Sequence, residues 1–252
     1  MSDFNYEDGL ESGTEVQGGG KVKNEVVAAK GDHAARIRSI VHCGVSEAFF
    51  DGQSKGKHPK CVIVFELKED GDFETDGVTP LTVSKDIEIK KGEKANVELL
   101  RAAFLKADGE KASNFNELIG CVGTVKIGHS KDGKYANVVA FNKGGVSGYP
   151  RKFAGMLPEL VGGVGNVKFS DMTLDALREC HGWYHVQDLM LAADGYEGSV
   201  CEQRVTEMRA IEGFEYYANR EAAMKAAKSK PTPTDEGQAK ATPAIVDDGA
   251  EY

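Results

Sequence analysis

The sequence predicts a small, mostly antiparallel β barrel over residues 31–152, with one helix after its third strand. Three observations support this fold class. Apolar residues alternate in steps of two through three successive segments, recur in steps of three and four through one segment, and then alternate again through two more. The chain has 252 residues and 40% hydrophobic content, enough for a substantial core.

The first predicted strand covers residues 33–43. Small or apolar side chains alternate there with Arg36, Arg38, Ile40 and His42. A strand with one buried face has this pattern. We therefore expect the two arginines on the solvent side, facing an anion or a partner acid such as Glu66.

The second and third predicted strands cover residues 60–67 and 80–89. The second is almost continuously apolar, and the third alternates. One side of the third strand carries Leu81, Val83, Ile87 and Ile89.

The period then becomes helical over residues 91–107, and Gly109 is expected to end the helix in a left-handed cap. The apolar face of that helix is formed by Val97, Leu100, Phe104 and Ala107. Strand periodicity returns in residues 121–129 and 134–142, which the turn-forming sequence SKDG separates. This order is that of the OB fold, a five-stranded Greek-key barrel that binds oligonucleotides or oligosaccharides through its one-two and four-five loops.

Composition limits the other possibilities. The net charge is −9, but residues 31–152 carry slightly more basic than acidic side chains, so the negative charge lies elsewhere. No apolar run approaches the roughly 20 residues that cross a bilayer, so no membrane association is expected. The five cysteines are odd in number and occur singly, which favours reduced thiols and the cytoplasm.

The candidate DNA-binding residues are basic and aromatic side chains of the first strand, the two loops and the segment that follows the barrel. Lysines follow a phosphate backbone while aromatic rings stack on bases. Alternatively, the loop lysines are only solvated, and the two phenylalanines close the open end of the barrel. The candidates are Arg36, Arg38, Phe49, Phe50, Lys55, Lys57, Lys60, Lys85, Lys131, Lys134, Tyr135, Tyr149 and Arg151.

Several short stretches in the right order resemble the OB-fold single-stranded-DNA-binding proteins of tailed bacteriophages. They are ARIRSIVHCG, GKHPKCVIVFEL, PLTVSKDIEI, KANVELLRA, FNELIGCVGTVKIGHSKDGKYANV and the pair Tyr149-Pro150. The resemblance covers about half of the chain. It implies a protein that coats single-stranded DNA during phage replication, recombination and repair, in the host cytoplasm. The residues themselves form no catalytic constellation, so no enzymatic activity and no cofactor are expected.

Residues 153–229 are expected to form a mostly helical extension. One helix is predicted over residues 173–193, capped by Ser170 or Asp171, and a second over residues 201–228. Cys180, His181 and His185 suggest a metal site, but too few ligands accompany them, so no metal is expected. The sequence LVGGVGNVKF lacks the Lys-Ser/Thr of a phosphate loop and is interpreted as a hinge.

Both ends of the chain are predicted to be disordered, over residues 1–30 and 230–252. The acidic tip resembles the tails with which single-stranded-DNA-binding proteins recruit replication enzymes. It would contact a polymerase, helicase or nuclease through Asp247, Asp248, Glu251 and Tyr252. A tail that only solvates the chain is the alternative.

The sequence therefore predicts a non-enzymatic protein that binds single-stranded DNA largely without sequence specificity. A strand-annealing or recombination-mediator protein, a virion structural or assembly protein, and an enzyme that uses the metal cluster are the other readings. Oligomeric state stays open, with a homo-oligomer as one option.

Overall fold

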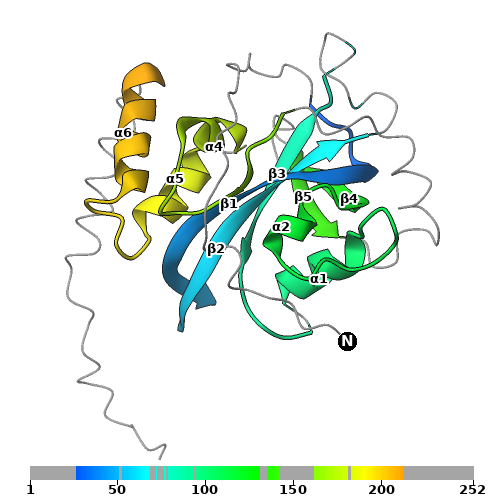
Figure 1. The fold of residues 1–252 in the computed structure, drawn as a ribbon, viewed down its shortest axis with the longest axis horizontal. Coiled ribbons are helices and arrows are strands. Elements are labelled where there is room, and N and C mark those ends of the chain that lie inside the picture. The colour runs from blue at the N-terminus through cyan, green and yellow to red at the C-terminus, as the bar shows by residue number, and fades with distance from the viewer. Residues whose placement is uncertain are drawn as a thin grey trace, which may run out of the picture. The chain divides into compact units, whose positions relative to one another are not determined.

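An antiparallel sheet with the strand order β3-β2-β1-β4-β5 forms the body of the protein, and a short sixth strand pairs in parallel with β1 (Figure 1). The strands are β1 (Gly31–Phe50), β2 (Gln53–Leu67), β3 (Thr82–Glu88), β4 (Val122–His129), β5 (Ala136–Phe141) and β6 (Gly165–Val167). The prediction of a mostly antiparallel β fold with a few helices is confirmed.

The structure is a computed structural model. It describes residues 27–50, 53–68, 72, 77, 79–93, 95–130, 136–141, 162–180 and 183–212. These residues all belong to one compact unit, which ends at Phe214. The predicted disordered ends lie almost entirely outside the described residues.

The two edge strands of the sheet, β3 and β5, lie next to each other. Lys85 of β3 donates a hydrogen bond from Nζ to the carbonyl oxygen of Val138 in β5, at 2.9 Å. The sheet therefore curls so that its two edges approach each other, which is compatible with a barrel-like fold.

The core lies inside this curled sheet and receives side chains from β1 to β5 and from the two helices that follow β3. Phe65 and Phe104 stack at its centre, with ring centroids 5.2 Å apart. One face of β3 points into the core, as predicted. The largest fully buried side chains are Phe65, Phe104, Phe115, Ile37, Ile40, Ile63, Leu67, Leu81, Ile87, Leu100 and Leu118.

The helix after β3 is shorter than predicted. Helix α1 covers Asn96–Ala103, and Phe104 is already extended. Leu105 instead pairs with Val122 at the start of β4, and Ala107 is exposed rather than in the core. Gly109 adopts the expected positive φ, but in a turn rather than in a helix cap. A strand-like pairing replaces the last predicted helical turn, because both the N–H and the carbonyl oxygen of Leu105 then bond to the backbone of Val122.

The close approach of β4 to the end of α1 requires a glycine. A Cβ atom at Gly123 would lie 2.3 Å from the carbonyl oxygen of Ala103 and 2.9 Å from the ring of Phe104. A short second helix, α2 (Phe115–Leu118), follows the turn, and the Asn114 side chain caps it.

Strand β1 changes face at a bulge, which the alternation in the sequence did not predict. The register with β2 shifts between Ile37 and Ser39, so Arg38 is the extra residue. Ala35 and Ile37 point into the core before the bulge, and Ile40 does so after it. The expectation that Ile40 lies on the solvent side is therefore wrong.

The segment between β5 and the C-terminal helices is not the predicted hinge, because Gly165–Val167 forms strand β6, which pairs in parallel with Ser39–Val41 of β1. His42 of β1 bonds from Nε2 to Asn166 Oδ1 of β6 at 2.8 Å. Burial lowers the pKa of His42 below 6.5, and the charge of Lys168 adds to that effect, although the bond to Asn166 opposes it. His42 is thus largely buried, not solvent-facing.

The first predicted C-terminal helix is two helices, α4 (Leu174–Glu179) and α5 (Trp183–Leu191). Its cap is Thr173 rather than Ser170 or Asp171, since the Thr173 hydroxyl accepts from the Ala176 N–H at 3.1 Å. Helix α6 (Val200–Glu212) follows. In Figure 1 these helices lie on one side of β1, and α1 and α2 lie on the other.

All five cysteines are free and buried. Burial raises the pKa of the Cys121 thiol to about 12. Within the described ranges, no helix is both long and apolar enough to cross a membrane.

Candidate nucleic-acid interface

The lysines that the sequence placed in the one-two loop lie in a strand instead. Strands β1 and β2 continue as a hairpin to the pair Phe50 and Gln53, so Lys55 and Lys57 belong to β2. The predicted loop is wrong because cross-strand pairing bonds the backbone groups that a loop would leave to water. The basic side chains remain on the surface, since Lys55 and Lys57 are exposed and Lys60 is half-buried.

Each hairpin lysine has an identified neighbour. The Lys55 ammonium lies 3.4 Å from Gln53 Oε1, and Lys60 donates to the backbone carbonyl of Glu47 at 3.2 Å. Lys57 pairs with Asp194, which follows α5. These contacts are solvent-exposed, so water and anions compete for the same ammonium groups.

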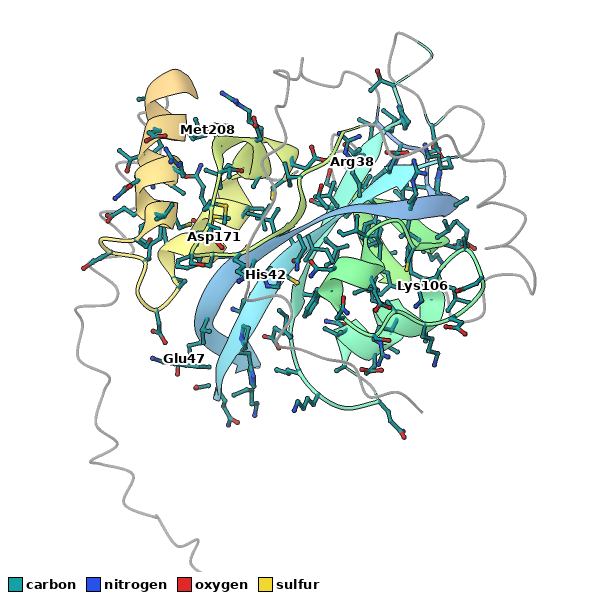
Figure 2. All side chains as sticks on the ribbon, in the orientation of Figure 1. Arg38, His42, Glu47, Lys106, Asp171 and Met208 are labelled. Carbon is teal, nitrogen blue, oxygen red and sulfur yellow. The ribbon has the colours of Figure 1, made fainter. Side chains whose placement is uncertain are left out.

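Arg36 and Arg38 do not lie on the solvent side. Arg36 is only 6% exposed and donates from Nη2 to Glu66 Oε1 at 2.8 Å. The partner acid that the cross-strand register offered is therefore the one that pairs with Arg36. Figure 2 labels Arg38 over the central part of the sheet, well away from Glu47 near the end of β1.

Arg38 links the sheet to the C-terminal helices. Its Nη1 lies 3.5 Å from Glu66 Oε2, and its Nε bonds to Glu179 at the end of α4. Lys68 also pairs with Glu66. We call these five residues, Arg36, Arg38, Glu66, Lys68 and Glu179, the buried ion network.

The buried ion network fixes the ionisation of Glu66. Burial by itself would raise the pKa of this carboxyl, but the hydrogen bond and charge of Lys68, together with Arg36, lower it below 4.5. Glu66 is therefore a carboxylate at neutral pH, and it neutralises cations that would otherwise attract phosphate. Sequence reasoning named Glu66 but missed Lys68 and Glu179. Glu179 lies 141 residues after Arg38, so no local sequence pattern connects the two.

The outer faces of β1 and β2 are buried as well as the inner ones. Val62 and Val64 of β2 are 1% and 0% exposed, although they alternate with the core residues. Ser39 of β1 is fully buried and accepts the Val164 N–H at 3.0 Å. The middle of these strands is therefore covered on both faces, whereas Lys55 and Lys57 of the hairpin remain exposed.

The remaining candidates are placed elsewhere or not described. Lys85 lies at the β3–β5 seam, where its ammonium bonds to Val138. The side chains of Phe49 and Phe50 lie outside the described residues. So do Lys131, Lys134, Tyr135, Tyr149 and Arg151, and the tail residues Asp247, Asp248, Glu251 and Tyr252.

The metal alternative gains no support from the part of the chain that the structure describes, where no group of three or more His, Cys, Asp or Glu residues could hold a metal ion. Cys180 is buried and donates its thiol to the Ala176 carbonyl at 3.3 Å. The side chains of His181 and His185 are outside that part.

Compared with known proteins, the chain matches no family, no curated protein and no solved structure. The hairpin and its exposed lysines are thus the candidate site on geometry alone.

Proposed function

We propose that the protein binds single-stranded DNA without strong sequence preference, through an OB barrel whose one-two hairpin carries Lys55, Lys57 and Lys60. The observation that carries the proposal is the strand order β3-β2-β1-β4-β5 with edges that approach each other. An OB barrel has this order, and it binds oligonucleotides beside the one-two connection.

The charge distribution supports the same ligand. The ammonium groups of the hairpin have solvent-exposed partners that an anion can replace. Arg36 and Arg38, which come earlier in β1, are instead neutralised in the buried ion network. Contacts made by ammonium groups to phosphate are independent of sequence. The proposed protein therefore coats DNA and does not read bases, and the resemblance to phage proteins suggests replication, recombination and repair as its setting.

The experiment is a titration of dye-labelled oligo-dT, followed by fluorescence anisotropy, at about 50 mM and about 200 mM salt. An oligonucleotide of about 20 nucleotides exceeds the roughly 4–16 nucleotides that one OB fold covers. We expect single strands to bind much more tightly than duplex, with affinity that falls as salt rises because counterions are released. Equal binding to duplex and single strand would contradict the proposal.

The hairpin itself is tested by the double variant Lys55→Ala and Lys57→Ala. Binding should weaken for every sequence alike, and the salt dependence should become shallower, because phosphate contacts are lost. The matched control is Lys30→Ala with Lys111→Ala, which removes two exposed lysines outside the hairpin. If both double variants lose the same affinity, the hairpin is not the site.

The acidic tail is proposed to recruit replication enzymes and to compete with DNA for the hairpin. An acid on the same chain competes with DNA at an effective concentration that depends on the length of chain joining it to the lysines. Removal of residues 234–252 should then tighten DNA binding at low salt. A truncated chain that binds no tighter would leave the tail without a part in DNA binding.

A further inference from the structure

The loop after α5 places the carboxylate of Asp194 on Lys57, an exposed lysine of the hairpin. Lys57 Nζ lies 3.0 Å from Asp194 Oδ1 and 2.9 Å from Oδ2, so the ammonium contacts both oxygens. The two side chains are 60% and 54% exposed. The pair is thus accessible to a competing anion from solvent.

The backbone holds Asp194 in this position. Its N–H donates to the carbonyl oxygen of Val45 in β1 at 2.7 Å. The preceding residue, Ala193, is 3% exposed and packs on Gly44 so closely that a Cβ atom at position 44 would lie 2.7 Å from the Ala193 Cβ. The main chain therefore holds Asp194 beside the hairpin, within reach of the Lys57 ammonium.

Two acids surround the Lys57 ammonium. Glu47 is its cross-strand neighbour, and Asp194 approaches from the loop. Hydrogen bonding and charge from Asp194, with a smaller contribution from Glu47, raise the pKa of Lys57 above 10.5. Glu47 is itself bonded to the Ser54 hydroxyl at 2.6 Å, which leaves Asp194 as the acid that bonds directly to the ammonium.

A carboxylate with two oxygens on an ammonium group offers the same interaction as two oxygens of a phosphate. We infer that Asp194 occupies the position on Lys57 that a DNA phosphate would take, and so sets the affinity of the hairpin for single strands. The inference rests on the proposed function. DNA binds this lysine only by displacing Asp194, and the protein therefore binds more weakly than its lysines allow.

The test compares Asp194→Asn with the wild type in the oligo-dT titration. The amide keeps the shape of the side chain and the backbone bond to Val45, but it removes the negative charge. Affinity at low salt should rise about two- to five-fold, the size of competition that an exposed ion pair exerts. The slope of log affinity against log salt should change by less than roughly 0.7, the value for one phosphate contact with a single strand, because Lys57 contacts phosphate in both proteins.

The control is Asp175→Asn, which removes the same charge from a half-buried pair with Arg178 on α4. Affinity should stay at the wild-type value in this control. In the Lys57→Ala background, the gain from Asp194→Asn should disappear, because no ammonium is left to release. An equal gain in that background, or in Asp175→Asn, would reveal a general charge effect and overturn the inference.

The outcomes separate this inference from the proposed function. If wild type and Asp194→Asn bind oligo-dT equally, the inference fails and the proposed function stands. If neither chain binds, both fail. Binding by Asp194→Asn where the wild type shows none would support both, since the carboxylate then blocks the site completely.

Discussion

Replacement of Glu66 by Gln should destabilise the protein strongly, because Glu66 is the centre of the buried ion network. Its side chain is 3% exposed and contacts Arg36, Arg38 and Lys68, whose side chains are 7%, 11% and 6% exposed. Glutamine keeps the shape of the side chain but removes the carboxylate that these three cations share, whereas Arg38 retains its own ion pair with Glu179. Removal of one partner from a buried ion pair costs about 3–5 kcal/mol. Because three cations share the Glu66 carboxylate, we expect the free energy of unfolding to fall by about 4 kcal/mol.

Urea unfolding followed by circular dichroism measures this loss. With a slope of about 2 kcal/mol/M, the midpoint should fall by about 2 M. The matched control is Glu207→Gln, since Glu207 pairs with Arg204 at 2.8 Å while the two side chains are 46% and 40% exposed. Such a pair contributes at most about 1 kcal/mol. A Glu66→Gln protein that loses no more stability than Glu207→Gln would show that Glu66 does not stabilise the fold through the buried ion network.

Three further predictions follow from burial and packing. The pKa of Glu66 lies below 4.5 and that of His42 below 6.5, so each group stabilises the fold above its ordinary pKa and loses that contribution as pH falls through the folded value. Unfolding free energy should therefore decline from about pH 6.5 downward, with a second decline below about pH 4.5 that is smaller in Glu66→Gln, where the lowered pKa of Glu117 still contributes. Gly123→Ala should cost about 3 kcal/mol in the same urea assay, because its Cβ would overlap the Ala103 carbonyl oxygen, and a loss under about 1 kcal/mol would contradict that geometry. Ellman's reagent should react with the five cysteines only after unfolding, because all five are buried. Burial also keeps the Cys121 thiol, with its pKa of about 12, protonated and therefore unreactive. Fast reaction in the native protein would show that a thiol is accessible to the reagent.

Periodicity predicted the strands well because burial on one face of a strand is a local property. The alternation of Leu81, Val83 and Ile87 identified the buried face of β3, and all three point into the core. The two strands around SKDG also lie where the sequence placed them. The helical period over residues 91–107 was less reliable, because its last turn was replaced by pairing between Leu105 and Val122, which are distant in sequence.

The candidate site was predictable only in part. Sequence reasoning found the exposed hairpin lysines, because Lys55 and Lys57 stand in a polar, glycine-containing stretch before an apolar strand. It misplaced Arg36 and Arg38, because alternation cannot reveal a bulge or an acid on a distant helix. It also missed Asp194, for which no local signal exists.

The order of β1 to β5 and the buried faces of strands such as β3 follow from the sequence, since they depend on which residues avoid water within a few positions of one another. Which charged side chains stay exposed and which are paired with an acid depends instead on contacts between residues far apart in the sequence. Glu179 neutralises Arg38 and Asp194 covers Lys57 across separations of 141 and 137 residues, respectively. Charge pairing acts through space over a few ångströms, so the chain must fold before its cations find their partners.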